Sequence, residues 1–195
     1  NFNFIKKDLS KTTNLINLTI PKIKLDNEII LVNNAANIGK IATINKKSKS
    51  DITSEYNLNI VAPTILSSQI INKYPANNKL IVNISSGASI KAISSWSTYC
   101  ASKAALDMLT NVIDNEKHEN LNIISIHPGI INTNMQKTIR NAKKADFPLK
   151  HKFMDYYKQN MLDKPNNTAK KIYYIIKNYK KFKQKIVSVR DIKLK

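Results

Sequence analysis

The sequence predicts an α/β fold built on a parallel sheet. Four short apolar runs, at 29–32, 80–84, 122–127 and 186–189, alternate with segments of helical periodicity. Such alternation is typical of a parallel sheet with crossover helices. The run at 29–32 is apolar without interruption, which favours a strand covered on both faces. A ligand is therefore expected beyond the carboxyl ends of the strands.

Length and composition indicate a single domain spanning residues 1–195, long enough to bury a hydrophobic core. The only cysteine, Cys100, excludes an internal disulfide and favours a reducing, cytoplasmic setting. No apolar run approaches the roughly 20 residues of a membrane helix, and no signal peptide is visible. We therefore expect a cytoplasmic protein without a membrane partner.

Charge and histidine placement argue against two other classes of protein. The formal net charge is +19, but the lysines are spread along the chain and become denser only after Lys137. We therefore favour a solvated basic surface over a nucleic-acid-binding face. The three histidines, His118, His127 and His151, lack metal-ligand spacing, so no metal site is expected.

The first 73 residues contain weaker signals. Segment 3–5 fits a short strand that leads into Asp8, with Ser10 as the cap of a ragged helix. A longer helical pattern covers 51–73 and contains Asn59, although asparagine has a low helix propensity. From the residues alone, Asn59 fits an exposed polar position as well as a functional one.

The stretch 81–103 carries the clearest chemistry. The strand at 80–84 ends at Ser85 and Ser86, and a helix predicted over 96–117 carries Tyr99 and Lys103 four positions apart, on one face. This trio suits carbonyl reduction: Ser86 hydrogen-bonds the carbonyl, Tyr99 delivers a proton, and Lys103 lowers the pKa of the phenol by its charge. Any helix can carry Tyr-x-x-x-Lys, so the preceding serines supply most of the evidence that the site is catalytic.

The second half of the chain completes the alternation. Pro128 and Gly129 end the strand at 122–127, and the aromatic-rich, basic segment 136–165 is expected to cover a substrate with a helix of its own. A helix over 168–180 then contributes a core stripe. Because the helix at 96–117 is apolar on two sides, one side can face the sheet and the other a second subunit, so we expect a homo-oligomer.

Together these motifs resemble the short-chain dehydrogenase/reductase family, in which Ser, Tyr and Lys occur in this order and spacing. SSWSTYCASKAALDM and HPGIINTNMQ are most similar to the branch of sepiapterin and benzil reductases, and the resemblance runs from Ile5 to about Ile192. It implies a Rossmann-like, doubly wound sheet and an NAD(P)H-dependent carbonyl reductase. NADP is the expected cofactor, with NAD not excluded, and the expected substrate is a small carbonyl compound, such as the dicarbonyl benzil or a pterin.

The resemblance also implies roles for individual residues. Asn59 distorts its helix and holds a water of the proton relay, beside Ser86, Tyr99 and Lys103. The expected substrate contacts are Ser86, Trp96, Tyr99 and Met135. The residues expected to border the cofactor, besides Tyr99 and Lys103, are Asp8, Leu9, Asn34, Ala35, Pro128, Gly129, Ile131 and Thr133. Ala36 stands where the family has glycine, and Asn132 and Asn134 replace the acids usual in the branch.

One expected feature is missing from these 195 residues. A dinucleotide fold holds the pyrophosphate with a glycine-rich loop after its first strand, but the only glycines are Gly39, Gly87 and Gly129. The resemblance begins at the third strand, so the fold is expected to be truncated at the N-terminus by one βαβ unit of roughly 30 or more residues. Two hypotheses follow: a reductase, favoured by the Ser–Tyr–Lys set, or a catalytically inactive remnant that binds a partner, favoured by the missing loop.

Overall fold

The computed structural model describes residues 4–24 and 27–194 of the chain. Within them, four parallel strands form one sheet in the order β1-β2-β3-β4. Their bounds are Ile29–Asn33 (β1), Lys79–Ile84 (β2), Leu121–His127 (β3) and Ile186–Ser188 (β4). Each lies within about a residue of its apolar run, so the predicted parallel α/β fold is confirmed.

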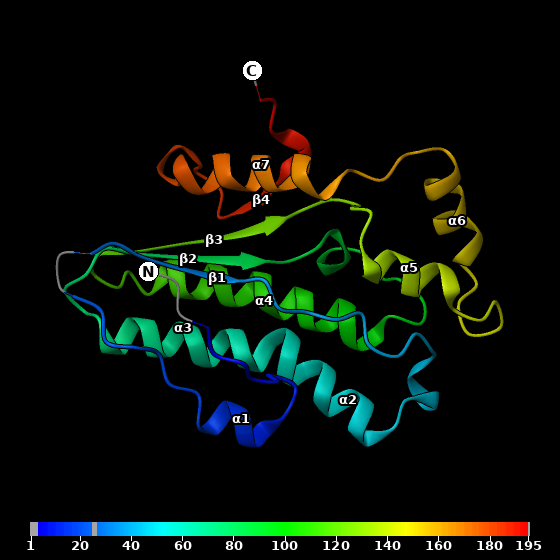
Figure 1. Cartoon of the computed structure of the whole chain (residues 1–195), viewed down its shortest axis with the longest axis horizontal. Coiled ribbons are helices and arrows are strands. Elements are labelled where there is room, and N and C mark those ends of the chain that lie inside the picture. The colour runs from blue at the N-terminus through cyan, green and yellow to red at the C-terminus, as the bar shows by residue number, and fades with distance from the viewer. Residues whose placement is uncertain (1–3, 25–26, 195) are drawn as a thin grey trace.

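Helices cover both faces of this sheet, as a doubly wound fold requires (Figure 1). In Figure 1, α3 and α4 lie on one side and α7 on the other, while α5 and α6 lie beyond the carboxyl ends of the strands. The α-helices of the described residues are Thr12–Ile16 (α1), Lys49–Tyr56 (α2), Ala62–Lys73 (α3), Ser97–Asn115 (α4), Asn134–Asn141 (α5), Lys150–Lys158 (α6) and Pro165–Lys177 (α7).

The core consists of two layers because successive side chains of a strand point to opposite faces. Leu80 and Val82 of β2 join the cluster that contains Ile175 of α7. Ile81, between them, joins the cluster that contains Ile113 of α4. Burying an aliphatic side chain of this size contributes roughly 1.5–3 kcal/mol, and burial on both faces explains why the strand reads as an uninterrupted apolar run.

The helical pattern at 51–73 forms two helices joined by a π-helical segment. Ser48 and Asp51 form a capping box at the start of α2, with their reciprocal hydrogen bonds at 3.0 and 2.9 Å. The π segment, Asn57–Val61, contains Asn59 and separates α2 from α3. Such segments are uncommon and occur frequently at functional sites.

The predicted N-terminal strand is wrong where it can be examined. Asn3 lies outside the described residues, and Phe4 and Ile5 form no strand and expose 77% and 63% of their surface. A strand needs a neighbour for its backbone hydrogen bonds, and in the described chain no strand pairs with these residues.

The predicted helix cap at Ser10 is also wrong. Helix α1 begins at Thr12, and its N-cap position is Lys11, which makes no side-chain cap. Instead, Asp8 Oδ1 accepts hydrogen bonds from the Ser10 amide at 3.0 Å and the Ser10 hydroxyl at 2.7 Å. The Asp8 carboxylate therefore closes a turn of its own and leaves the Ser10 side chain unavailable to the helix.

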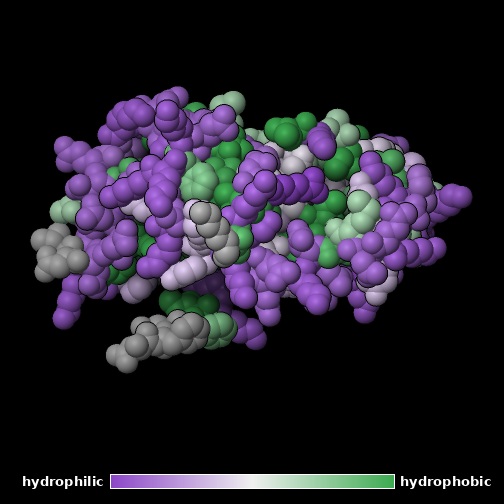
Figure 2. Space-filling model, turned by 90° about the horizontal axis from the view of Figure 1, so that it is seen from above, coloured by the Kyte–Doolittle hydropathy of each residue, from purple (hydrophilic) through white to green (hydrophobic). Residues whose placement is uncertain are grey.

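The surface is strongly polar on the side of α7. Figure 2 looks onto this helix and the C-terminal segment and shows mainly hydrophilic side chains, with apolar surface between them. Within residues 4–24 and 27–194, none of the helices has the length and apolar character needed to span a bilayer.

Candidate active site

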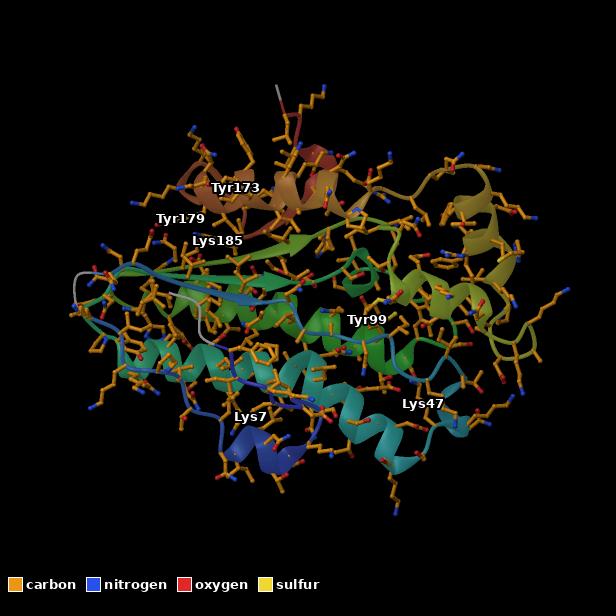
Figure 3. The ribbon with its side chains drawn as sticks, in the orientation of Figure 1. Lys7, Lys47, Tyr99, Tyr173, Tyr179 and Lys185 are labelled. Atoms are coloured by element: carbon orange, nitrogen blue, oxygen red, sulfur yellow. The ribbon has the colours of Figure 1, made fainter. Side chains whose placement is uncertain are left out.

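Ser86, Tyr99 and Lys103 meet at the carboxyl edge of the sheet. Ser86 follows β2, and Tyr99 lies in the first turn of α4 (Figure 3). The Tyr99 phenol is hydrogen-bonded with Ser86, and Lys103 Nζ lies 5.9 Å from the centre of the Tyr99 ring. The structure thus brings together the hydroxyl, phenol and ammonium that the sequence predicts, which a strand end and a four-residue helical spacing are sufficient to achieve.

Burial determines the ionisation of the phenol. Only 6% of the Tyr99 surface is exposed, and this burial raises the pKa of the phenol, while the hydrogen bond with Ser86 acts in the opposite direction. The predicted lowering of the Tyr99 pKa by Lys103 is therefore not found in this arrangement, because the cost of burying a phenolate is the larger effect. Tyr99 holds its proton at neutral pH, as a proton donor must.

Lys103 is a buried cation that forms no ion pair with any described residue. Its Nζ donates to the backbone carbonyl of Ile84 at 2.7 Å. Burial lowers the pKa of Lys103 to about 8, and the charge of Asp107 opposes that shift. An ammonium held by a single carbonyl retains two donor hydrogens for a ligand.

Asn59 is buried, so the alternative of an exposed polar position is wrong for it. It lies in the π segment with 1% of its surface exposed. Its side chain pairs with the backbone of Asn37, accepting from the amide at 3.0 Å and donating to the carbonyl at 2.9 Å. Asn59 therefore fixes the loop after β1.

A second polar cluster, which the sequence did not predict, lies directly behind Lys103. Asp107 Oδ1 accepts from the Ser125 hydroxyl at 2.6 Å, and Asp107 Oδ2 lies 2.8 Å from His127 Nε2. Ser89 Oγ lies 3.2 Å from the same nitrogen. Burial raises the pKa of Asp107, but the hydrogen bonds from His127 and the serines outweigh it, so the net pKa is below the usual range.

The available signal for this cluster was weak. Asp107 follows Lys103 by one helical turn and interrupts an apolar pattern, and His127 immediately precedes Pro128. Each feature is common in isolation, and only the fold brings the two together.

Most residues predicted to border a cofactor lie at this same edge. In the sheet register, Asn33 pairs with Asn83, and Asn83 with Ser125, so the segments that follow the first three strands are adjacent. They contain Asn34, Ala35, Ser86, Pro128 and Gly129, with Ile131 and Thr133 a few residues further along. Thr133 is the N-cap residue of α5, although its side chain makes no cap hydrogen bond.

Asp8 and Leu9 are placed differently from the other predicted residues. No strand precedes them in the described chain, and they lie in the turn before α1. That turn is held against the π segment by Asn57, whose Nδ2 donates to the Ser10 carbonyl at 3.0 Å and to Thr12 Oγ1 at 3.1 Å. Their predicted contact with a cofactor stays a prediction.

Of the predicted substrate residues, Trp96 and Met135 belong to one apolar cluster with Tyr99, while Ser86 lies outside it. Trp96 meets Tyr99 edge-on, with ring centres 5.8 Å apart, and stacks on Phe147 at 5.6 Å. Phe153 of α6 and Met135 of α5 complete the same cluster. The segment 136–165 therefore packs against the phenol and contains most of α5 and all of α6 rather than one helix; that it covers a substrate stays a prediction.

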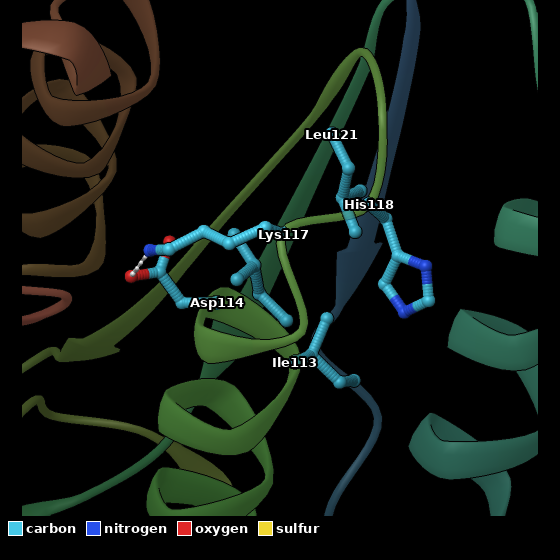
Figure 4. Close-up of a pocket in the computed structure, with 6 residues that line it drawn as sticks. Ile113, Asp114, Lys117, His118 and Leu121 are labelled. Carbon is cyan, nitrogen blue, oxygen red and sulfur yellow. Dashed lines mark ion pairs between the residues drawn. The ribbon is translucent and has the colours of Figure 1, made fainter.

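Other features of the described residues carry less chemistry. They contain no group of three or more His, Cys, Asp or Glu side chains that could hold a metal ion. A small pocket of about 150 Å³ lies at the far end of α4, lined by Ile113, Asp114, Lys117, His118, Leu121 and Ile123 (Figure 4). Because Asp114 and Tyr99 are at opposite ends of a helix of 19 residues, this pocket does not belong to the site.

The comparisons with known proteins identify the family. The profile described as short chain dehydrogenase matches residues 2–144, which is well over half of the chain. The protein therefore belongs to the short-chain dehydrogenase/reductase family.

Within that family, two reductases show where the similarity lies. The chain is 34% identical over 146 residues to the benzil reductase ((S)-benzoin forming) of Bacillus subtilis (strain 168), which covers 72% of this chain and 60% of the relative. It is 29% identical over 141 residues to the sepiapterin reductase of Xenopus laevis, covering 69% and 53% of the two chains. The chain thus spans 60% or less of the length of these curated relatives.

Solved structures support the same fold. A short-chain dehydrogenase/reductase from Saccharomyces cerevisiae, 23% identical, superposes with a TM-score of 0.77 over 96% of this chain and 76% of its own. The KRED1-Pglu enzyme, 26% identical, gives 0.66 over 71% and 58%. A 4-hydroxyisoleucine dehydrogenase complexed with NADH, also 26% identical, gives 0.61 over 82% and 65%.

Proposed function

We propose that this protein is an NAD(P)H-dependent carbonyl reductase in which Tyr99 is the proton donor. The observation that carries the proposal is the buried arrangement of Ser86, Tyr99 and Lys103, in which a protonated phenol lies beside an unpaired ammonium. The similarity to benzil and sepiapterin reductases supports a dicarbonyl or a pterin as the substrate. The proposal includes NADP as the preferred cofactor, with NAD as the alternative.

The carboxyl edge fits the nicotinamide end of such a cofactor. Asn33 Oδ1 and Asn37 Oδ1 are buried there without a hydrogen-bond partner among the described residues. Lys103 Nζ donates to one backbone carbonyl and retains two donor hydrogens for a ligand. Asn34, Lys103 and Thr133 would hold the nicotinamide and its ribose. The cradle for the pyrophosphate is not among these 195 residues, so we expect dinucleotide affinity to be weak in this chain by itself.

Each side chain of the site then has a separate role in the reduction. When bound, NAD(P)H supplies the hydride. Ser86 orients the substrate carbonyl, and Tyr99 gives its proton to the oxygen as negative charge develops there. The ammonium of Lys103 favours the phenolate that remains, and Asn59 holds the loop that flanks the cofactor.

The surface of α4 supports a dimer as part of this proposal. Met108 and Val112 expose 61% and 45% of their surface on the side of α4 away from the sheet. A second copy of the chain in the cytoplasm would bury such residues, and sedimentation of the purified protein measures whether it does.

The test is reduction of benzil and of sepiapterin, followed by loss of NADPH or NADH absorbance. We expect turnover in the 195-residue chain or, where dinucleotide affinity limits it, in a chimera that carries the N-terminal βαβ unit of the B. subtilis relative. A folded chimera that binds NADPH but reduces neither compound, nor any other dicarbonyl, would refute the proposal.

A further inference from the structure

Asp107 of α4 is a buried carboxylate that the proposed reduction does not use. Only 5% of its surface is exposed. An isolated buried carboxylate is strongly unfavourable, so neighbouring groups in the fold must stabilise this charge. Lys103 lies four positions earlier in the same helix, so Lys103 and Asp107 share one face of α4.

Hydrogen-bond donors from β3 stabilise the charged form of Asp107. Asp107 Oδ1 accepts from the Ser125 hydroxyl at 2.6 Å, and Asp107 Oδ2 lies 2.8 Å from His127 Nε2. Because a carboxylate can only accept, the ring nitrogen is the donor in the second contact. Burial raises the pKa of Asp107, but these hydrogen bonds hold it below the usual range. Asp107 is therefore a negative charge inside the protein at neutral pH.

The cluster contains Ser89, His127 and Asp107, but it is not a nucleophilic triad. Ser89 Oγ lies 3.2 Å from His127 Nε2, which is the same ring nitrogen that contacts Asp107. In a triad the serine and the acid contact opposite ring nitrogens, so that one nitrogen takes the serine proton while the acid holds the other. The charge of Asp107 therefore has a different use.

Lys103 is the cation on which Asp107 acts. Its Nζ donates to the Ile84 carbonyl at 2.7 Å, and its own carbonyl accepts from the Ser85 hydroxyl at 3.3 Å. The end of β2 thus holds both the backbone and the ammonium of Lys103. Burial lowers the pKa of Lys103 to about 8, and the charge of Asp107 opposes that shift.

The other titratable groups beside this part of α4 supply no free negative charge. Tyr99 is protonated, because burial raises the pKa of its phenol. Glu55 of α2 is paired with Lys47 at 2.7 Å. The imidazole of His127 is neutral or cationic. Among the described residues, Asp107 is therefore the carboxylate that supports the charge of Lys103.

From this arrangement we infer that Asp107 is a positioning residue of the reductase, whose buried carboxylate keeps Lys103 in the charged form that assists Tyr99. The inference deepens the proposed function and rests on it. Asp107 acts through Lys103, one helical turn away, and touches no reacting atom. A neutral Lys103 would not favour the phenolate that remains after Tyr99 gives its proton, so an enzyme without this carboxylate should lose activity at a lower pH.

An NMR titration of Lys103 tests the inference without any need for turnover. In the 195-residue chain labelled with ¹³C,¹⁵N-lysine, the Lys103 side chain is assigned by its absence from Lys103→Met. Asp107→Asn keeps the shape of the side chain and removes its charge, so the midpoint of the Lys103 titration should fall by about one pH unit. Asp114→Asn is the matched control: it removes an acid of the same helix that is paired with Lys117 and Lys185, and it should leave the midpoint unchanged.

A second variant, Ser125→Ala, separates the charge of Asp107 from the packing of its cluster. It removes the hydrogen bond of 2.6 Å but leaves the carboxylate ionised, so the Lys103 midpoint should move by less than about 0.3 pH unit. An Asp107→Asn protein with the wild-type midpoint, or an equal shift in Ser125→Ala, would overturn the inference.

The reciprocal measurement applies where Asp107→Asn does not fold. Coupling between two sites acts equally on both, so Lys103→Met should raise the pKa of the Asp107 carboxyl by about one unit, followed by ¹³C NMR. An Asp107 carboxyl that titrates alike in both proteins, down to the pH of acid unfolding, would also overturn the inference.

Turnover of the chimera distinguishes failure of this inference from failure of the proposed function. If both hold, Asp107→Asn should reduce benzil within about twofold of the wild-type rate at pH 6 and about fivefold more slowly at pH 8, where less of its Lys103 is protonated. A wild-type chimera that reduces no dicarbonyl, with the Lys103 shift present, would refute the reductase and leave the coupling of Asp107 to Lys103 standing. An active reductase whose pH profile is the same in Asp107→Asn would refute the positioning role and leave the reductase standing.

Discussion

Two buried lysines near the carboxyl edge, Lys47 and Lys103, are held in opposite ways. Lys47 Nζ lies 2.7 Å from Glu55 Oε2 and 2.8 Å from Thr98 Oγ1, so its charge is fully paired. Lys103 Nζ has one backbone carbonyl and no carboxylate within ion-pair distance. A paired cation fixes the fold around it, whereas an unpaired cation beside a phenol keeps its charge available for chemistry.

The paired lysine supports the site from outside. Glu55 Oε1 accepts from the Lys40 amide at 2.7 Å, and its other oxygen accepts from Thr98, the residue before Tyr99. This cluster therefore ties the loop after β1 to the first turn of α4. Figure 3 shows Lys47 and Tyr99 on neighbouring elements at that end of the molecule.

The largest effect is expected at the phenol. Tyr99→Phe keeps the ring in its apolar cluster and removes only the acid, so turnover should fall by about 10²–10⁴-fold. The measurement is steady-state reduction of benzil by NADPH in a form that binds the cofactor, with cofactor affinity as the control, since it should change little. Near-normal turnover in this variant would remove Tyr99 from the mechanism.

Removing the cation of the Lys47–Glu55 pair should destabilise the fold by nearly as much free energy as the loss of turnover in Tyr99→Phe represents. Lys47→Met leaves the Glu55 carboxylate buried without its cation, and breaking a buried pair in this way typically costs about 3–5 kcal/mol. Urea unfolding measures the loss as a lower midpoint at constant slope. A loss below about 1 kcal/mol would show that the Lys47–Glu55 pair does not fix the loop.

The sequence predicted the unpaired lysine and not the paired one, for a physical reason. Tyr99 and Lys103 are one helical turn apart and follow a strand end at Ser86, so local periodicity is enough to place them. Lys47 bonds Glu55 eight positions away and Thr98 51 positions away, and neither spacing is a helical or strand period that a local pattern would show.

The same limit explains the failures elsewhere. The four strands of the sheet were predictable because each reads as a largely apolar run. The expectation that the strand at 29–32 is covered on both faces is wrong, because Ile30 and Val32 of the edge strand β1 expose 45% and 44% of their surface. Phe4 and Ile5 have strand-like composition, but pairing is a property of a neighbour rather than of the residues themselves. The contact between Asp107 and His127 was not predicted because neither residue stands out in the sequence. Only the fold brings Asp107 Oδ2 within 2.8 Å of His127 Nε2.

Replacing the unpaired Lys103 should raise the free energy of unfolding, whereas replacing the paired Lys47 should lower it. Burial lowers the pKa of Lys103 to about 8, against roughly 10.4 for an unfolded lysine. Below pH 8, Lys103 is protonated in both the folded and the unfolded protein, and its buried charge destabilises the fold. Between pH 8 and about 10.4, Lys103 is protonated mainly in the unfolded protein, so the free energy of unfolding rises with pH. Lys103→Met should therefore be more stable than the wild type at pH 7, by roughly 1–3 kcal/mol.

That advantage should decrease across the same interval of pH. Urea midpoints at pH 7, 8, 9 and 10 measure it, with the reductase activity lost at every pH because the ammonium is gone. A Lys103→Met protein less stable than the wild type at pH 7 would mean that the charge of Lys103 is compensated in the fold, and the contrast with Lys47 would disappear.

The smallest effect on the free energy of unfolding is expected at Lys46, the residue before Lys47. Its ion pair with Asp146 is only slightly longer than that of Lys47, 2.9 against 2.7 Å, but the Lys46 side chain is 54% exposed and that of Lys47 is fully buried. Exposed pairs contribute about 0–1 kcal/mol because water and salt solvate both charges when the pair is broken. Lys46→Met should therefore lower the free energy of unfolding by less than about 1 kcal/mol, and 0.5 M salt should abolish the difference. A loss equal to that of Lys47→Met would mean that loop geometry, rather than burial of the charge, determines the cost at both positions.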